Sequence, residues 1–333
     1  MKKAASIGNL TEWLLEPDNP SVRYLTLRDI VGCPKNDPEL IKAKEDILSD
    51  SRVQRIFNKQ KPEGYWEEAR KPYNPKYKGT YWQVMILSQL GLDKSDERVR
   101  KACEYIFQFQ LDEGGFSSFE KPSPEKIREY EFSCLTGNVA ASLIRLGYEG
   151  DERVMKAVEW LVEVQNRDGG WLCPYWKAHI NDKHSCFMGT ITPLDAFSEM
   201  PRGKLSCEME STIDTGVEFL LMHRLFMADH HGFKVINQSW LNLGFPSFSY
   251  DILRGLSVVT KLGYVKDERI NDALEFLLGK QGSDGRWVLD SSPIGRMHAT
   301  LEQKGEPSKW ITLHALKVIK RVQSQSNTFG QDI

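Results

Sequence analysis

Residues 156–171, KAVEWLVEVQNRDGGW, carry the pattern that decides the fold. Within this stretch a glycine follows the glutamine by four residues, and an aromatic residue follows the same glutamine by six. The same spacing occurs in three further stretches that end at Trp66, Phe116 and Trp287, and a degraded copy lies at 216–233. A fixed spacing of this kind indicates an architecture built from repeated structural units.

A second recurring element joins consecutive units. Leu-Gly is followed within a few residues by Asp-Glu-Arg and a β-branched residue at 90–99, 146–154 and 262–270. Glycine often ends a helix in the left-handed conformation, and aspartate is a preferred N-cap. The glutamate that follows favours the positive end of the next helix. The joins therefore predict consecutive helices separated by tight turns.

Two kinds of helix are expected to alternate. In 151–165 the apolar residues form one stripe, which predicts a helix with one solvated face. Residues 135–146 are apolar or small on nearly all sides, which predicts a helix that is covered on both faces. We place outer helices near 7–16, 51–60, 96–110, 151–165, 210–224 and 267–280, and inner helices near 20–31, 79–90, 132–146, 184–198, 248–262 and 307–322. The predicted fold class is all-α, an (α/α)6 barrel or toroid of six hairpins, with an open solenoid as the alternative.

The repeats predict a single domain over residues 1–323. Its units lie near 51–95, 96–150, 151–207, 208–265 and 266–322, with 1–50 as an unmarked sixth pair and 324–333 as a polar tail. The formal net charge of −2 gives no reason to expect a nucleic acid partner, and no apolar stretch is long enough to predict a transmembrane helix. We expect a soluble cytoplasmic protein whose six cysteines are reduced thiols.

The pattern Lys-Ala-x-x-Trp-Leu-x-x-x-Gln-x-x-x-Gly-x-Trp at 156–171 resembles the glutamine–tryptophan (QW) repeat of squalene–hopene cyclases. Related Gly-Gly-aromatic repeats occur in protein prenyltransferase β-subunits, and the resemblance covers roughly residues 51–322. It implies that the repeats tie neighbouring outer helices together, so that their glutamines are structural. It also implies that the chemistry lies in a central cavity, near the starts of the inner helices, and that the ligand there is an isoprenoid or another apolar molecule.

The acidic motifs of terpene cyclases are missing from this sequence. Class II enzymes protonate an alkene with Asp-x-Asp-Asp, and magnesium-dependent synthases use Asp-Asp-x-x-Asp, but neither pattern occurs here. The closest acidic cluster, at 93–97, is the turn and cap between two repeats. Cyclisation by the usual acid is therefore disfavoured, and a cyclase would need a non-standard acid.

A zinc site is suggested by His-Ser-Cys-Phe at 184–187, which resembles the His-Thr-Cys-Tyr sequence of prenyltransferase β-subunits. Cys134 opens the preceding inner helix, although Glu131 precedes it by three residues rather than two. Thiolate and imidazole are ligands that zinc prefers. The predicted set is Cys134, Cys173, His184 and Cys186, with His179 or Asp182 as a substitute. The alternative is that small buried cysteines pack the helix starts and that the histidines lie on a wet loop.

A third candidate site lies at the start of the fifth inner helix. Tyr250, Asp251 and Arg254 would meet there, with the aspartate as an acid or the arginine as an anion ligand. The alternative is an internal Asp–Arg ion pair that joins neighbouring helices. The segment 223–232 replaces the normal repeat with an insertion, which we expect to be a surface loop that covers the cavity.

Aromatic residues near the helix starts are candidates for the wall of an apolar pocket or, equally, for packing of the ring. The predicted ligand-binding residues are Tyr81, Trp82, Trp176 and Trp310. The leading hypothesis is an isoprenoid-binding protein, with zinc-dependent prenyl transfer as the nearest analogy. The alternatives are a non-catalytic lipid-binding or protein-interaction scaffold and a terpene cyclase with a non-standard acid. The prenyltransferase resemblance implies a separate α-subunit as partner, whereas a free-standing monomer is equally allowed.

Overall fold

The computed structural model describes residues 7–119, 132–173 and 183–326, and the chain divides into two compact units. The first unit comprises Met1–Gln54, Leu221–Ile294 and Thr300–Ile333, and the second comprises Arg55–Leu220 and Gly295–Ala299. Nearly all regular structure in the described residues is helical, which confirms the predicted all-α class. None of the described helices is both long and apolar enough to cross a membrane.

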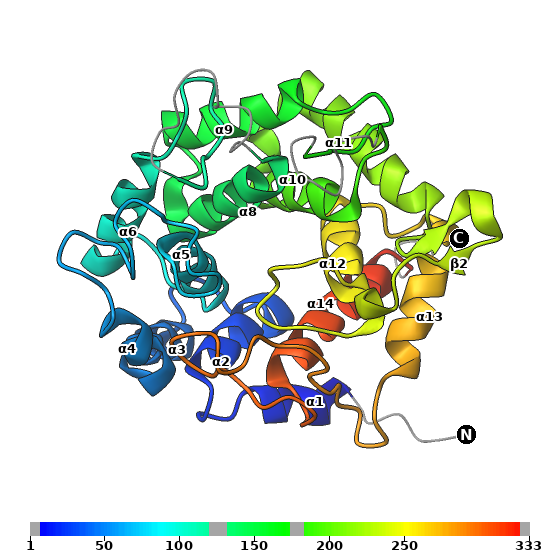
Figure 1. Cartoon of the computed structure of the whole chain (residues 1–333). Coiled ribbons are helices and arrows are strands. Elements are labelled where there is room, and N and C mark those ends of the chain that lie inside the picture. The colour runs from blue at the N-terminus through cyan, green and yellow to red at the C-terminus, as the bar shows by residue number, and fades with distance from the viewer. Residues whose placement is uncertain (1–6, 120–131, 174–182, 327–333) are drawn as a thin grey trace. The chain divides into compact units, whose positions relative to one another are not determined.

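The second unit consists of helical hairpins in two layers (Figure 1). One layer contains α5 (Thr80–Gln89), α8 (Ser133–Leu143) and α10 (Phe187–Glu199), and α8 packs against both neighbours. The other layer contains α6 (Glu97–Phe107), α9 (Glu152–Glu163) and α11 (Cys207–Met222). The short helices η2 (Ile144–Tyr148) and η3 (Arg202–Lys204) follow α8 and α10, and α4 (Ser51–Phe57) runs from the first unit into the second. These bounds agree with the predicted alternation of inner and outer helices.

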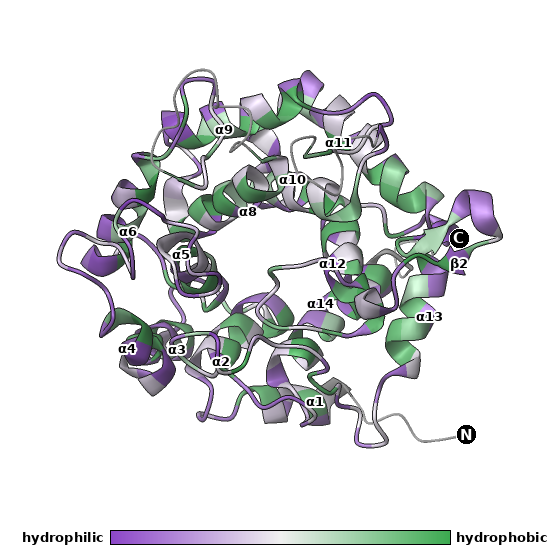
Figure 2. Cartoon of the chain, in the orientation of Figure 1, coloured by the Kyte–Doolittle hydropathy of each residue, from purple (hydrophilic) through white to green (hydrophobic). Residues whose placement is uncertain are grey.

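The two layers differ in burial as the sequence predicts. Every residue from Thr80 to Ser88 in α5 is buried, and α8 is buried along its length except at Cys134. In α6 and α9, by contrast, hydrophilic residues alternate with hydrophobic ones, and only one stripe of each is buried (Figure 2). The apolar residues of α9 therefore bury against the inner layer while its opposite face meets solvent.

The joins between hairpins have the predicted caps. Gly91, Gly147 and Gly263 adopt φ of 84°, 95° and 109°, which is the left-handed region that glycine tolerates best. The aspartates that follow accept a backbone N–H two residues on at 2.8–2.9 Å. These aspartates are Asp96, Asp151 and Asp267.

The aromatic residues of the repeats anchor each outer helix to an inner one. Trp66, Trp171 and Trp287 are fully buried, and each indole N–H donates to a carbonyl ten residues earlier at 2.7–2.8 Å. The backbone N–H of each repeat aromatic also donates to a threonine Oγ1 near the start of an inner helix. These threonines are Thr80, Thr136, Thr190 and Thr312.

The repeat glutamines link successive outer helices. The amides of Gln60, Gln110 and Gln165 each donate to the repeat glycine of their own turn and to a carbonyl of the next outer helix. The second set of carbonyls belongs to Arg98 at 2.9 Å, Arg153 at 2.7 Å and Thr212 at 2.9 Å. These bonds give the glutamines the structural role that the resemblance implied.

The first unit joins the two ends of the chain. It contains α1 (Ile7–Leu14), α2 (Pro20–Thr26), η1 (Leu27–Val31), α3 (Pro38–Ser49), α12 (Ile252–Leu262), η6 (Glu268–Ile270), α13 (Asn271–Gly279) and α14 (Lys309–Ser326). Helix α14 packs against α12, α2 and α1, so the first and last predicted hairpins touch within this unit. The Lys309 ammonium pairs with Glu16 at 2.8 Å across this contact.

Two segments of the first unit differ from the predicted pattern. Helix α3 was not predicted, although Asp37 caps it and Leu40, Ala43 and Ile47 form its buried stripe. The insertion forms a short antiparallel pair of β1 (Met227–Ala228) and β2 (Lys234–Val235) around η4 (Asp229–His231), followed by η5 (Gln238–Leu241). The His230 side chain is 90% exposed, which agrees with a surface location.

Candidate functional site

Asp251 is a buried carboxyl at the first turn of α12. One of its oxygens accepts the backbone N–H of Arg254 at 2.8 Å, and the other accepts that of Gly244 at 3.0 Å. The residue is only 8% exposed, and burial raises the pKa of its carboxyl to about 6, although the two backbone bonds and the Arg254 charge oppose this shift. A carboxyl with this pKa is partly protonated near neutral pH, whereas an ordinary aspartate is almost entirely ionised.

The other two residues of the predicted site lie beside Asp251. The Tyr250 hydroxyl donates to the carbonyl of Leu225, its ring packs edge-on against Trp240 at 5.0 Å, and burial raises its pKa well above the usual range. Arg254 is 5% exposed, and its guanidinium lies 3.5 Å from the carbonyl of Ser249. The structure therefore brings the three predicted residues together within the first unit.

A second buried carboxyl in the same unit, Glu302, was not predicted. It accepts the Ser308 hydroxyl and the backbone N–H groups of Lys309 at 2.8 Å and Trp310 at 3.4 Å, at the start of α14. Burial raises its pKa, and these hydrogen bonds oppose the shift. Glu302 lies seven residues before Lys309, whose backbone N–H it accepts, whereas ordinary capping residues lie within about three residues of the N–H that they bind, so capping patterns do not reveal Glu302.

The described aromatic candidates are packed into the protein. Tyr81 is fully buried and donates to the carbonyl of Ser117 at 2.9 Å, while Trp310 is 1% exposed and stacks on Phe245 at 4.0 Å. Trp82 is 5% exposed and donates to a tyrosine carbonyl at 2.7 Å. Trp176 lies outside the described residues. Contact of these rings with a ligand stays a prediction.

Two of the predicted metal ligands meet at the start of α8, in the second unit. The Sγ atoms of Cys134 and Cys173 are 3.6 Å apart, and the Ser133 hydroxyl lies 3.5 Å from Cys173 Sγ. Hydrogen bonds from the Cys134 thiol, the Ser133 hydroxyl and the first backbone N–H groups of α8 lower the pKa of Cys173 to about 6, although burial opposes them. The pKa of Cys134 is raised because it hydrogen-bonds to Cys173 and is buried.

The other two predicted ligands belong to the segment that leads into α10. Cys186 caps this helix, with Sγ accepting the backbone N–H of Gly189 at 3.0 Å. His184 is exposed. Glu131, His179 and Asp182 lie outside the described residues, and within the described ranges no three His, Cys, Asp or Glu side chains are grouped to hold a metal ion. The zinc site stays a prediction.

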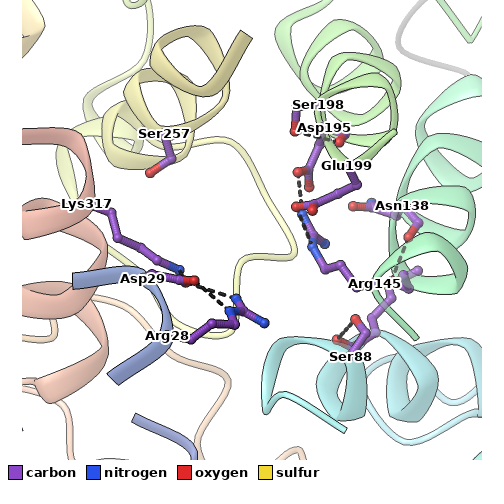
Figure 3. A network of polar contacts seen from close by, with 12 residues as sticks. Arg28, Asp29, Ser88, Asn138, Arg145, Asp195, Ser198, Glu199, Ser257 and Lys317 are labelled. Atoms are coloured by element: carbon purple, nitrogen blue, oxygen red, sulfur yellow. Dashed lines mark hydrogen bonds and ion pairs between the residues drawn. The ribbon is translucent and has the colours of Figure 1, made fainter. Parts of the chain in front are cut away.

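Each unit also contains an ion network that was not predicted (Figure 3). In the first unit Asp29 pairs with Lys317 and with Arg28 at 2.6 Å. Burial alone would raise the pKa of Asp29, but the hydrogen bonds and charges of its two partners hold that pKa well below its usual range. Burial lowers the pKa of Lys317, and Asp29 opposes this shift.

The network of the second unit joins the ends of two inner helices. The Arg145 guanidinium, which follows α8, bonds Glu199 at 2.8 Å and also pairs with Asp195, and both carboxylates belong to α10. Glu199 lies 54 residues and Asp195 lies 50 residues after Arg145 in the sequence, so no local pattern could have paired them.

Comparison with known proteins gives one family match. The family described as "Squalene-hopene cyclase C-terminal domain" matches residues 39–179. A terpene cyclase/mutase, atnI, of Arthrinium sp is 20% identical over 299 residues, covering 78% of this chain and 40% of the relative. The resemblance to the terpene cyclase superfamily is confirmed. The chain spans about two fifths of the length of this terpene cyclase relative.

Two solved structures match over nearly the whole described extent of the chain. The type II terpene cyclase MstE from Scytonema, in its R337A form with geranylgeranyl dihydroxybenzoate, is 16% identical with a TM-score of 0.48, and the match covers 96% of this chain and 99% of MstE. A protein from Actinoplanes is 13% identical with a TM-score of 0.45, and that match covers 93% of this chain and 90% of the other.

Proposed function

We propose that this chain binds an isoprenoid and starts its cyclisation by protonating an alkene, with Asp251 as the acid. The match to the squalene–hopene cyclase family over residues 39–179 and the relative named as a terpene cyclase/mutase support this class of reaction. The proposal is limited to this class of reaction, because this chain spans only 40% of the longer relative.

The observation that carries the proposal is the raised pKa of a buried carboxyl. An acid that protonates an alkene has to hold its proton at the working pH. With a pKa of about 6, about one Asp251 carboxyl in ten is protonated at pH 7, whereas an ordinary aspartate is almost entirely ionised. Backbone N–H groups, among them those of Arg254 and Gly244, hydrogen-bond to the two oxygens, which together offer about four acceptor positions, so the protonated carboxyl can keep these bonds.

The neighbouring side chains suit a developing carbocation. Tyr250, which precedes Asp251 in the chain, forms an edge-to-face pair with Trp240, and aromatic faces attract cations by their quadrupoles. The positive charge of Arg254 attracts the negative charge of ionised Asp251, so it stabilises the carboxylate that forms after proton transfer. In this proposal Asp251 donates the proton, the aromatic rings stabilise the carbocation, and Arg254 stabilises the carboxylate.

A non-catalytic isoprenoid-binding protein is the second candidate. It is favoured by the missing Asp-x-Asp-Asp motif and by the structural contacts of both Asp251 oxygens, one of which caps α12 while the other accepts the backbone N–H of Gly244. Zinc-dependent prenyl transfer is not part of the proposal, because the described residues contain no group of three metal ligands.

The proposal is tested by incubating the full chain with an uncyclised geranylgeranyl arene or squalene and analysing the products by gas chromatography and mass spectrometry. Asp251→Asn keeps one side-chain oxygen to accept the backbone N–H of Arg254, loses the acceptor that binds the N–H of Gly244, and removes the acid. We expect it to reduce product formation by at least about 100-fold. Asp267→Asn is the matched control, since Asp267 caps an outer helix in the same unit and is partly exposed. We expect it to change turnover by less than about twofold.

Equal turnover by Asp251→Asn and the wild type would show that Asp251 is not the acid. If no cyclised product forms, but the isoprenoid stays bound in native mass spectrometry, the binding protein replaces the cyclase.

A further inference from the structure

The cysteines at the start of α8 are a feature that neither the repeat architecture nor the proposed cyclisation uses. Cys134 lies in the first turn of α8, and Cys173 lies 39 residues later in the chain, yet their sulfur atoms are 3.6 Å apart. Both cysteines are free in the structure. A disulfide bond is about 2.05 Å long, so the two sulfurs need to approach by only about 1.5 Å to form one.

We propose that Cys134 and Cys173 form a reversible dithiol–disulfide pair that is oxidised by peroxide. The geometry places one sulfur where it can react first and the other where it can complete the bond. No isoprenoid takes part, so this modification site is independent of the proposed cyclisation.

Cys173 is the sulfur that reacts first. Its Sγ lies 3.5 Å from the Ser133 hydroxyl oxygen and 3.6 Å from the Cys134 sulfur, and once Cys173 is ionised both groups can donate to it, as can backbone N–H groups at the start of α8. These donors and the positive end of the helix stabilise a thiolate, which is the nucleophilic form of cysteine. The side chain is 5% exposed, which leaves access for an oxidant as small as hydrogen peroxide.

The oxidation then balances in two steps. The Cys173 thiolate attacks one peroxide oxygen, the O–O bond breaks, and the hydroxide that leaves takes up a proton to become water. The product is a sulfenic acid on Cys173. The Cys134 sulfur attacks the Cys173 sulfur, the S–O bond breaks, and the second water leaves with the Cys134 proton. Two thiols lose two electrons and two protons, and the peroxide is reduced to two waters.

Cys134 is the suitable resolving residue because its thiol already contacts Cys173. Cys186 is the nearest competitor, but its sulfur accepts the backbone N–H of Gly189 at 3.0 Å and caps α10. The other thiols provide contrasts: Cys103 is fully buried and its pKa is raised to about 12 by burial, whereas Cys207 is exposed.

The test treats the reduced full chain with hydrogen peroxide, blocks the remaining thiols by alkylation, and maps the tryptic peptides by mass spectrometry. We expect a cross-linked Cys134–Cys173 peptide that disappears on treatment with dithiothreitol. Cys173→Ser should slow peroxide-dependent thiol loss by at least about tenfold. Cys134→Ser should leave a sulfenic acid on Cys173 that dimedone traps, and Cys103→Ser should behave like the wild type.

Three results would overturn the proposal. The first is that in the wild-type chain Cys173 can still be alkylated after Cys207 has been oxidised. This result is obtained with the wild-type chain alone, so it does not depend on whether a variant folds. The second is a cross-link from Cys173 to Cys186 in place of Cys134. The third is a chain purified with zinc bound by these thiols, shown by metal analysis and by protection of Cys134 and Cys173 from alkylation.

Discussion

Replacement of Gly114 by alanine tests whether the repeat glycines are the points where neighbouring outer helices meet. Gly114 has a φ of +122°, and a Cβ added there would lie 2.5 Å from the carbonyl oxygen of Lys156 in α9. The same close approach occurs at Gly64 and Gly169, where the Cβ would meet a carbonyl oxygen of the next outer helix at 2.5 and 2.4 Å. The spacing that decides the fold therefore has a steric cause.

The expected loss of stability has two parts. An alanine in the left-handed region costs about 1–2 kcal/mol, and forcing a methyl group into a packed contact costs about 1–3 kcal/mol more. The neighbouring atoms are backbone rather than the end of a flexible side chain, so the contact cannot relax cheaply. We expect Gly114→Ala to lower the free energy of unfolding by roughly 2–5 kcal/mol, a large part of the stability of an ordinary domain.

Two glycines of the same unit separate strain from steric overlap. Gly295 has a φ of +74° but no heavy atom within 4 Å of an added Cβ, so Gly295→Ala should lose only about 1–2 kcal/mol. Gly203 has neither feature, and Gly203→Ala should unfold within about 0.5 kcal/mol of the wild type. Urea unfolding followed by circular dichroism measures all three variants. The steric explanation is wrong if Gly114→Ala and Gly295→Ala unfold at the same urea concentration.

Three further predictions follow from the buried polar contacts. The pKa of Asp251 is about 6 in the folded state and about 3.9 in the unfolded state, so between these pH values the folded state binds more protons. The contribution of Asp251 to the free energy of unfolding should therefore fall as the pH rises from about 4 to about 6. Urea unfolding of Asp251→Asn across that pH range should lack this decline. Asp29→Ala leaves Lys317 buried without its carboxylate and should cost about 3–5 kcal/mol in thermal or urea unfolding, whereas Asp46→Ala, in an exposed helical ion pair, should cost less than about 0.5 kcal/mol. Gln110→Leu removes two hydrogen bonds to backbone carbonyls, at 2.9 and 2.7 Å, and should cost about 1–3 kcal/mol in the same assay; no measurable loss would remove the glutamine from the contacts that hold the outer helices.

Local patterns were enough to predict the helical framework. The caps at Asp96 and Asp151 and the left-handed glycines before them depend on residues close in sequence, and these were placed correctly. Helix α3 was missed although its signals are also local, with Asp37 before Pro38 and buried residues spaced along one face. This helix belongs to no repeat, so the repeat spacing does not indicate it.

The candidate sites depended on contacts that a single sequence does not contain. The sequence placed Cys134 near a helix start, but the 3.6 Å contact of its sulfur with Cys173 arises from two chain segments that only the folded hairpins bring together. Tyr81 and Trp310 were candidates either for the wall of a pocket or for packing of the ring; hydrogen bonding and stacking hold both rings in the core, and their contact with a ligand stays a prediction. Residue type and helix position do not determine which face of an inner helix meets its neighbours.

Proton-initiated cyclisation is tested most directly by incubating the full chain with an uncyclised geranylgeranyl arene in heavy water. The proton that starts the reaction comes from a carboxyl that exchanges with solvent, so each cyclised product should carry one deuterium at the carbon that was protonated. Mass spectrometry and NMR of the product identify that position. A cyclised product without deuterium, or no cyclised product at all, would contradict the assignment of this chain as a cyclase that works by protonation.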